Sequence, residues 1–397
     1  MKKKVVDAIE RVIKANEADQ QELTAVAVTQ EGKTPPAIAG NSAALYTLWF
    51  GLDYGSILTA YALYRTVEEL GKTPYLLAKP DALWSDHYAD RENIAGKFIY
   101  AHCAVLPGQV PENIHTHIVG SDVVWDCRII NDAVKAYFYL NEVTGKDDIR
   151  VALGTSFGGQ YQMDVNKRND DSVLFHKFDG ISVKSFEDSQ FLSDYYYIQP
   201  EIVLDPVFLC DKNAYRVCAG QSVAKKVEKE EHFIFTYIKN GNERKRSLLL
   251  KGNAVLLESF QAPLRNFIDI NRYPESRAAL GLEPAYHILV EDWLHYLIHS
   301  DFVITDDYYG MCFAILFEKP FVVVCDRGIQ NKSDFCTLLE QLDLTERIVY
   351  TDEDYKTKLY LFRKPIRYNI VNAKLEKLRS DSRDWFKAQM SSQNDHA

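Results

Sequence analysis

The sequence predicts an α/β fold with two Rossmann-like domains that face a cleft. Strand-like and helix-like segments alternate along the 397 residues, a pattern typical of parallel sheets covered by helices. Glycines follow several strand-like segments, where a tight turn leads into the next helix. Two separate series of this kind join near residue 210, and a highly charged run at 225–231 precedes the second. We therefore expect one domain for each series.

The chain is expected to divide into four segments. They are an N-terminal helix with a linker, a first Rossmann-like domain, a second one, and a C-terminal helix with a tail, with bounds at 1–36, 37–209, 210–368 and 369–397. Apolar residues at helical spacing predict helices at 3–18 and 371–390. We expect the C-terminal helix to pack back across the first domain.

Short apolar runs that end at turn residues predict the strands. In the first domain they lie at 45–50, 74–77, 116–119, 150–153, 180–183 and 201–204, with a helix at 56–70 that Gly71 ends. In the second domain we expect strands at 232–237, 253–257, 302–305 and 321–325, and helices at 290–298 and 311–317. The basic run 244–246 is interpreted as a solvated turn, with contact to an anion as the alternative.

Composition excludes several classes of function. Lys plus Arg number 46 and Asp plus Glu number 56, and the net charge of −10 argues against a nucleic-acid partner. The seven cysteines form no CxxC pair, which favours reduced thiols in a cytoplasmic protein. No apolar run is long enough to span a membrane. Three lysines at positions 2–4 leave weak peripheral contact with the inner face of the cytoplasmic membrane as an alternative.

One loop has the features of an anion site. The predicted strand 302–305 runs into Asp306, Asp307, Tyr308, Tyr309 and Gly310, where the next helix is expected to begin. Unpaired N–H groups and the positive end of a helix favour a small anion such as a phosphate. We expect such an anion there, between the two domains. The alternative is an ordinary turn whose acids cap the helix.

Other motifs are less specific. The loop that ends at Ser56 and the Gly120–Ser121–Asp122 turn can be explained by caps and tight turns, and neither is a GxGxxG dinucleotide site. His115 and His117 are metal-ligand types at strand spacing, but no acidic residue adjoins them, so no metal is expected. The chain has no GxSxG, HExxH or P-loop motif.

Five motifs, in order, resemble those of the polysaccharide pyruvyltransferase family, and the likeness is collinear from about residue 45 to residue 390. They lie at 53–63, 120–125, 155–158, 204–206 and 301–321. The resemblance implies a GT-B-like pair of Rossmann domains and an enzyme that transfers pyruvate from phosphoenolpyruvate to sugar hydroxyls, usually as a cyclic ketal, in capsule or exopolysaccharide assembly. Phosphoenolpyruvate is then the donor substrate, no cofactor is needed, and the acceptor is a lipid- or nucleotide-linked sugar.

The chain departs from the family where the chemistry is expected. Tyr309 stands where the family has His, Asp307 where it has Ser, Lys184 where it has Arg, and Asp334 follows Ser333 where it has a Ser-Arg pair. Ketal formation needs an acid, a base and a cationic clamp. Lysine is a point charge without the two parallel bonds of a guanidinium, and tyrosine is a poorer proton shuttle at neutral pH than histidine.

The candidate site follows from these motifs. The candidate catalytic residues are Tyr309, Asp307, Asp306 and Lys184. The candidate substrate-binding residues are Asp53, Tyr54, Gly55, Ser56, Ser121, Asp122, Ser156, Phe157 and Gly310. Two alternatives stay open: a glycosyltransferase-like enzyme that uses a nucleotide sugar, and a non-catalytic partner of glycan-assembly enzymes. Contact with such enzymes and self-association are open as well.

Overall fold

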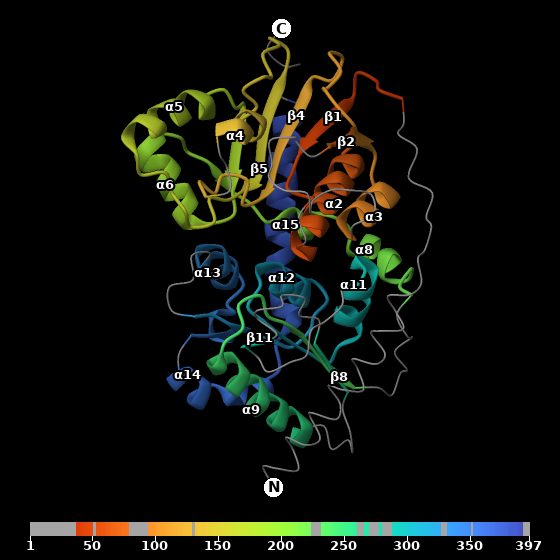
Figure 1. Ribbon diagram of the computed structural model, residues 1–397, viewed down its shortest axis with the longest axis vertical. Coiled ribbons are helices and arrows are strands. Elements are labelled where there is room, and N and C mark those ends of the chain that lie inside the picture. The colour runs from red at the N-terminus through yellow and green to blue at the C-terminus, as the bar shows by residue number, and fades with distance from the viewer. Residues whose placement is uncertain are drawn as a thin grey trace. The chain divides into compact units, whose positions relative to one another are not determined.

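The computed structural model describes residues 37–50, 53–78, 94–128, 132–223, 232–259, 266–269, 278–279, 288–326, 332–350 and 352–391. Contacts within the chain divide these residues into two compact units, each with its own parallel sheet (Figure 1). The N-terminal unit comprises the described residues up to Asp211 together with 332–343 and 370–391. The C-terminal unit comprises the described residues of 212–326 and 344–369.

The sheet of the N-terminal unit has seven parallel strands in the order β3-β2-β1-β4-β5-β6-β7. The strands are β1 (Ser42–Tyr46), β2 (Thr73–Leu77), β3 (Val105–Leu106), β4 (Thr116–Asp122), β5 (Ile149–Thr155), β6 (Gly180–Val183) and β7 (Glu201–Ile202). The order starts at β1, runs outward to β3 and then returns past β1 to β4. This reversal is typical of doubly wound folds, whose ligands bind at the carboxyl ends of the strands.

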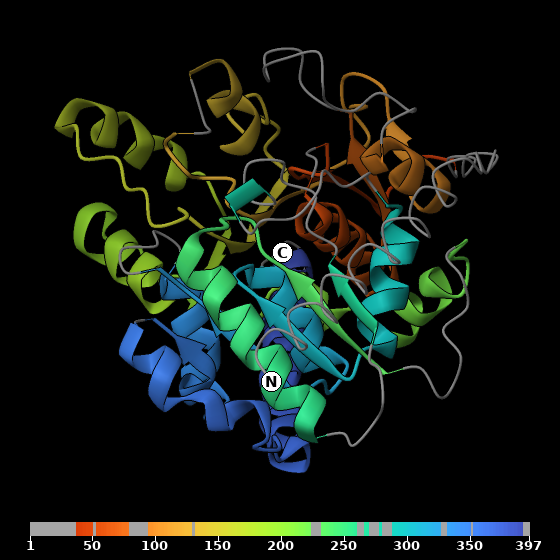
Figure 2. The same cartoon turned by 60° about the horizontal axis from the view of Figure 1, so that its bottom comes forward.

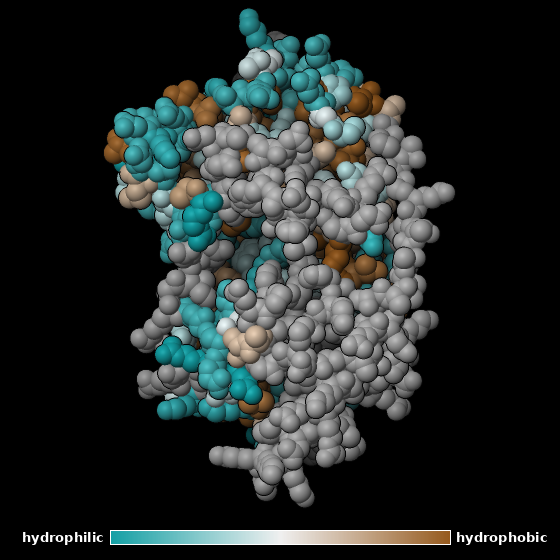
Figure 3. All heavy atoms as spheres, in the orientation of Figure 1, coloured by the Kyte–Doolittle hydropathy of each residue, from teal (hydrophilic) through white to brown (hydrophobic). Residues whose placement is uncertain are grey.

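Helices surround this sheet. They are α2 (Tyr54–Glu69), α3 (Ile94–His102), α4 (Asp132–Phe138), α5 (Val165–Phe175), α6 (Phe186–Tyr196), α7 (Pro206–Leu209), α13 (Lys332–Gln341) and α15 (Tyr368–Ser391). Helix α2 packs on β2 and β4 and is buried along most of its length. Its C-terminus precedes Gly71, whose φ of +91° confirms the predicted stop. The outward surface of α5 carries mostly hydrophilic side chains (Figure 3), together with the exposed Val165 and Val173.

Helix α15 packs on the N-terminal unit, as predicted. The hydroxyl of Ser382 accepts a hydrogen bond from the Leu204 N–H at 3.0 Å. The Arg379 guanidinium donates to the Phe208 carbonyl oxygen at 2.5 Å, and Arg383 pairs with Glu69 at 2.9 Å. The last helix of the chain thus stabilises the loop after β7 and the helix α7 that follows it.

The C-terminal unit has a five-stranded parallel sheet in the order β12-β11-β10-β8-β9. Its strands are β8 (Phe233–Tyr237), β9 (Asn266–Asp269), β10 (Phe302–Thr305), β11 (Phe321–Val324) and β12 (Ile348–Val349). Its helices are α8 (Lys212–Ala219), α9 (Glu243–Ser259), α11 (Val290–His299), α12 (Tyr308–Leu316) and α14 (Asp352–Thr357), with short 3-10 turns at Thr345–Arg347 and Leu359–Phe362. Helix α9 lies across the sheet (Figure 2), where Leu248, Leu249 and Leu256 join the core.

The predicted fold class, α/β with two Rossmann-like units, is confirmed. Three local predictions are wrong. Residues 253–257 belong to helix α9 rather than to a strand, because leucines at helical spacing pack α9 on the sheet. The run 244–246 is no solvated turn, since it lies in the same helix and Lys245 is fully buried. The first strand is Ser42–Tyr46 instead of 45–50, because the small residues Ala43 and Ala44 fit a crowded central strand.

The contacts also divide the chain differently from the predicted bounds. The predicted second domain comprises all of 210–368, whereas residues 332–343, which include α13, pack with the N-terminal unit. Helix α13 contacts α6, and the Phe186 N–H donates to the Thr337 hydroxyl at 3.1 Å. The predicted helix at 3–18 lies outside the described residues. None of the described helices combines the length and the apolar character needed to cross a membrane.

Candidate functional site

A buried lysine lies at the carboxyl end of the N-terminal sheet. Lys184 directly follows β6, and its side chain is 2% exposed. Its ammonium donates to Asp205 Oδ2 at 3.1 Å. Asp205 is the N-cap of α7, and its Oδ1 accepts from the Thr59 hydroxyl at 2.8 Å and the Val207 N–H at 3.1 Å. The ion pair is therefore fixed by a helix cap and by a side chain of α2.

The Gly120–Ser121–Asp122 segment ends strand β4 beside this pair. The Ser121 hydroxyl lies 2.9 Å from Asp205 Oδ2 and 2.9 Å from the Gly154 carbonyl oxygen, the two acceptors for its one proton. The Ser56 hydroxyl, from the first turn of α2, donates to Asp122 Oδ2 at 2.5 Å. Gly120 has a φ of +135°, and a Cβ there would overlap the Leu153 carbonyl oxygen, so only glycine fits. The Gly120–Ser121 peptide bond is cis.

Asp334 of helix α13 completes the group that we call the Lys184 cluster: Lys184, Asp205, Ser121, Asp122, Ser156 and Asp334. Ser156, after β5, donates to Asp334 Oδ2 at 3.1 Å and accepts from the Gly158 N–H at 3.0 Å. Burial raises the pKa of Asp334 to about 7; the ammonium of Lys184 opposes this rise and the charge of Asp188 adds to it. In the sequence, Asp334 is recognisable only as an acid in the place of an expected cation. Its approach to Ser156, 178 positions earlier, could not be read from the sequence.

Electrostatics within the cluster favour one charged lysine and one protonated acid. Burial opposes the charge on Lys184, but Asp205, Asp334 and Asp122 outweigh it and hold the lysine pKa above its ordinary value. Burial also raises the pKa of Asp188, the second acid that the sequence analysis missed. Asp188 accepts from the Tyr161 hydroxyl at 2.9 Å and from the Phe157 N–H at 3.4 Å. The site therefore contains a positive charge and an acid that can give up a proton near neutral pH.

The remaining sequence-predicted residues of this unit have structural contacts. Asp53 caps α2 by accepting from the Gly55 N–H at 2.9 Å, and Tyr54 is fully buried. Phe157 packs in an aromatic core, with its ring 5.5 Å from that of Trp125. The structure brings Ser56, Ser121, Asp122, Ser156 and Lys184 together and places Asp53, Tyr54, Gly55 and Phe157 in the elements that support them. Their roles toward a substrate stay predictions.

The C-terminal unit contains a second buried lysine. Lys245 is fully buried, and its ammonium contacts Asp306 at 2.6 Å, Asp326 at 3.0 Å and the Asn240 carbonyl oxygen at 2.6 Å. Asp306, after β10, also accepts from the backbone N–H groups of Lys239 at 2.6 Å and Asn240 at 2.9 Å. Lys239 in turn pairs with Asp307 at 2.5 Å. We call these five residues, Lys245, Asp306, Asp326, Lys239 and Asp307, the Lys245 cluster.

A side chain of the protein already occupies the N-terminus of helix α12. Asp307 is its N-cap and accepts from the Gly310 N–H at 2.7 Å. A Cβ on Gly310 would lie 2.5 Å from Thr305 Oγ1, so glycine is needed for the close approach of α12 to β10. Tyr309 is 3% exposed, and its ring lies 5.3 Å from that of Tyr308. A small anion at Gly310 would have to displace the Asp307 carboxylate, and its binding there stays a prediction.

His115 and His117 have an acidic neighbour that sequence spacing concealed. Asp148 Oδ1 lies 3.0 Å from His115 Nδ1 and 4.0 Å from His117 Nε2, while His117 Nδ1 lies 3.1 Å from the Tyr46 hydroxyl. Burial lowers the pKa of His117 to about 4. Among the residues that the structure describes, no group of three or more His, Cys, Asp or Glu side chains is placed to hold a metal ion.

The two parallel-sheet units and the motif loops gathered around Lys184 define an α/β protein built of Rossmann-like units. A sequence model of the family described as polysaccharide pyruvyl transferase matches residues 53–324. This match covers more than half of the chain, so the chain belongs to the polysaccharide pyruvyl transferase family. No curated protein matches the sequence.

Solved structures show only a distant likeness in fold. The UDP-GlcNAc 2-epimerase of Neisseria meningitidis has 10% identity and a TM-score of 0.48, with 88% of this chain and 99% of that chain covered. The UDP-GlcNAc 2-epimerase of Methanocaldococcus jannaschii has 10% identity and a TM-score of 0.44, with coverage of 81% and 91%. A calicheamicin glycosyltransferase has 11% identity and a TM-score of 0.46, with coverage of 89% and 99%.

Proposed function

We propose that this protein transfers pyruvate from phosphoenolpyruvate to hydroxyl groups of a sugar during the assembly of a capsule or exopolysaccharide. Membership in the polysaccharide pyruvyl transferase family supports a function as a transferase. The observation that carries the proposal is Asp334, an acid with a pKa raised to about 7 that bonds to Ser156 in the same cluster as the Lys184 ammonium. A proton donor and a cation are two of the groups that pyruvyl transfer requires.

The proposed chemistry assigns one role to each group. The Asp334 carboxyl gives its proton to C3 of phosphoenolpyruvate, which turns C3 into a methyl group and makes C2 an oxocarbenium centre. A sugar hydroxyl attacks C2 and forms a C–O bond, and its proton goes to Asp122, which the Ser56 hydroxyl orients at 2.5 Å. The C2–O bond to phosphate then breaks with both electrons on phosphate. A second hydroxyl then attacks the oxocarbenium carbon C2 and closes the cyclic ketal, and its proton returns to the Asp334 carboxylate.

Lys184 is the proposed cationic contact for the donor. Its ammonium is occupied by Asp205 at 3.1 Å, and both side chains are buried. The donor carboxylate or phosphate would therefore share the ammonium with Asp205 or replace it. Thr59 and Val207 donate to the other oxygen of Asp205 and would keep its charge stabilised.

The C-terminal unit does not supply the proton donor in the proposed reaction. Asp306 and Asp307 each contact a lysine, and Asp307 also caps α12, so both carboxylates already have donors. Tyrosine, with an ordinary pKa of about 10, is a poorer proton donor at neutral pH than Asp334. We therefore assign the proton to Asp334 and leave the catalytic roles of Asp306, Asp307 and Tyr309 as predictions.

The proposal includes the acceptor and the place of the reaction. A lipid- or nucleotide-linked sugar made in the cytoplasm would be the acceptor, and phosphoenolpyruvate would be the donor with no cofactor. The enzyme would then work in the cytoplasm or at the inner face of the cytoplasmic membrane, beside other glycan-assembly enzymes. Five of the seven cysteines are buried, which is compatible with reduced thiols.

Thermal unfolding with added phosphoenolpyruvate tests donor binding. A ligand at 100 times its Kd adds about 2.7 kcal/mol to the stability of the folded state. We expect this stabilisation in the unmodified protein and in Asp334→Asn, which keeps the size and the Ser156 contact. With a competent acceptor, phosphate release by Asp334→Asn should fall by about 10² to 10⁴, the usual contribution of a general acid. Equal phosphate release by both proteins would refute the role of Asp334.

A non-catalytic role is the second candidate, because Lys184 is neutralised by Asp205 and because Asp334 stands where the family has arginine. This candidate predicts no stabilisation by millimolar phosphoenolpyruvate and no phosphate release. The same titration with UDP-glucose and other nucleotide sugars covers the glycosyltransferase alternative. Stabilisation by nucleotide sugars alone would contradict the pyruvyltransferase proposal.

A further inference from the structure

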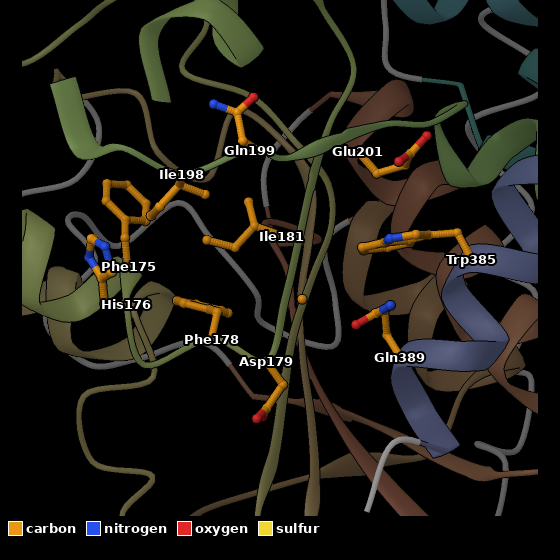
Figure 4. Close-up of a pocket in the computed structure, with 11 residues that line it drawn as sticks. Phe175, His176, Phe178, Asp179, Ile181, Ile198, Gln199, Glu201, Trp385 and Gln389 are labelled. Atoms are coloured by element: carbon orange, nitrogen blue, oxygen red, sulfur yellow. The ribbon is translucent and has the colours of Figure 1, made fainter. Parts of the chain in front are cut away.

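A cavity lies at the end of the N-terminal sheet opposite to the Lys184 cluster. It has a volume of about 310 Å³, at the lower limit for small-molecule sites. Its walls come from the amino ends of β6 and β7, the turn after α5 and the last part of α15 (Figure 4). Lys184 lies beyond the carboxyl end of β6, so the two sites share no residue.

Aromatic and aliphatic side chains form two facing walls of this cavity. Trp385 and Gln389 project from α15 on one side, and Phe178 and Ile181 face them from the other (Figure 4). Trp385 is partly exposed, whereas the other described tryptophans, Trp49, Trp125 and Trp293, are at most 1% exposed. An indole ring left open to a cavity offers a flat apolar surface beside a polar N–H group.

Several hydrogen-bonding groups that line the cavity keep the capacity to bond a ligand, although Asp179 already accepts from the Arg150 N–H at 2.7 Å. Within the described part of the chain, neither the Trp385 indole N–H nor the Glu201 carboxylate has a hydrogen-bond partner. Gln199 donates its amide to the Ser193 hydroxyl at 2.8 Å, which leaves its carbonyl oxygen as an acceptor. His176 Nδ1 donates to the Ser172 carbonyl oxygen at 2.7 Å, and in the neutral imidazole this bond leaves Nε2 as an acceptor.

The charge of the lining selects against anions. Asp179 and Glu201 are both acidic, and no lysine or arginine is among the described residues around the cavity. Phosphate, phosphoenolpyruvate or a uronic acid would meet like charge there. A pyranose without charge fits better, because its C–H groups can stack on an indole and its hydroxyls both donate and accept hydrogen bonds.

We infer that this cavity binds a neutral sugar residue of a glycan chain, at a site separate from the Lys184 cluster. Trp385 supplies the stacking surface and one donor. Glu201, Gln199 and His176 supply acceptors for the hydroxyl groups. Such a site would hold a glycan to the protein independently of any chemistry, and the inference does not depend on the proposed function.

Calorimetric titration of the full chain with methyl β-D-glucoside, methyl β-D-galactoside and N-acetylglucosamine tests this inference, with glucuronic acid as the charged comparison. We expect at least one neutral sugar to bind in the millimolar range and glucuronic acid to bind about tenfold more weakly. Trp385→Ala should weaken the sugar binding about tenfold. Glu201→Gln, a change on an exposed side chain, should weaken it as well. Failure of all three neutral sugars to bind would overturn the inference.

Control variants show whether a loss of sugar binding is specific to this cavity. Phe186→Ala removes another exposed aromatic ring of the same unit, outside the cavity, and should leave the sugar affinity unchanged. Trp385→Phe should bind more weakly and should lose the change in tryptophan fluorescence on sugar addition. Equal affinity of Trp385→Ala and the unmodified chain would contradict the assignment. The titration contains no phosphoenolpyruvate and needs no turnover, so a failure of pyruvyl transfer would not count against this site.

Discussion

Each of the two units buries a lysine among aspartates at its parallel sheet. The two lysines differ in the number and the kind of groups that surround them. In the Lys245 cluster, two lysines face three aspartates, and Asp306 also receives two backbone N–H groups. In the Lys184 cluster, one lysine faces Asp205, Asp122 and Asp334, and burial leaves Asp334 with a pKa of about 7. Asp326 of the Lys245 cluster is 32% exposed, whereas Asp334 is buried, and burial raises the pKa of an acid when cations and hydrogen bonds do not offset it. The Lys245 cluster therefore stabilises its unit, whereas the Lys184 cluster can also exchange a proton.

The largest expected effect is the loss of the Lys245 charge. Lys245→Met keeps the length of the side chain but leaves Asp306 buried without its ammonium partner. Breaking a buried ion pair from one side costs about 3–5 kcal/mol. We expect a loss of this size in the free energy of unfolding, measured by urea denaturation.

Lys319→Met is the matched control in the same unit. The Lys319 ammonium donates to the neutral Ser300 carbonyl oxygen at 2.9 Å, so its removal should cost about 1–2 kcal/mol. Equal losses for the two variants would show that the Lys245 ion pairs add nothing beyond a hydrogen bond. The contrast between the two clusters would then fail.

The next effect is a pH dependence that arises from the Lys184 cluster. Asp334 has a folded pKa of about 7 and an ordinary value of 3.8, so the folded protein binds more protons than the unfolded chain between these values. Stability contributed by this group is therefore lost as pH rises from about 4 to about 7 and stays constant above. Relative to the unmodified protein, Asp334→Asn should gain stability over this range, on the order of a few kcal/mol.

Denaturation at a series of pH values measures this difference. Asp381→Asn, at an exposed position of α15, provides the control and should follow the unmodified protein at every pH. A stability difference between Asp334→Asn and the unmodified protein that does not change between pH 4 and pH 7 would mean that Asp334 is ionised in the fold. The proton donor of the proposed reaction would then be lost.

The smallest effect compares two buried serines, one in each unit. Ser56 donates to the Asp122 carboxylate at 2.5 Å, whereas Ser300 donates to the neutral Leu297 carbonyl oxygen at 2.9 Å. Hydrogen bonds to charged groups contribute about 1.5–3 kcal/mol and neutral ones about 1 kcal/mol. Ser56→Ala should therefore lower the free energy of unfolding more than Ser300→Ala. A larger loss for Ser300→Ala would contradict the electrostatic account of the Lys184 cluster.

Individual strands and helices show which parts of the fold could be predicted from the sequence. Strands β6 and β10 begin and end at the predicted residues, because apolar runs bounded by turn residues are local signals. The predicted strand at 253–257 failed because its apolar residues also fit the helical spacing of α9. Lys245 was interpreted as solvated because a basic run is usually exposed, and nothing nearby in sequence indicated Asp306, 61 positions later.

The candidate site was predicted in part. The motif loops led to Lys184, Ser121, Asp122 and Ser156, which the structure brings into one cluster. Asp188 and Asp334 were missed as acids, because their pKa values depend on burial and on charges that are distant in the sequence. The one sequence signal for Asp334 was its position in place of a family arginine. In the structure, this position holds a buried acid that bonds to Ser156 and has a raised pKa.

The sequence by itself determined the α/β class, the order of most strands and helices, and the loops that carry the family motifs. These features depend on local periodicity, turn residues and caps, which act over a few residues. Only the tertiary structure decided that α13 joins the N-terminal unit and brings Asp334 to Ser156, and that the N-terminus of α12 is capped by Asp307. The protonation of a buried acid depends on every charge around it, and folding alone brings those charges together.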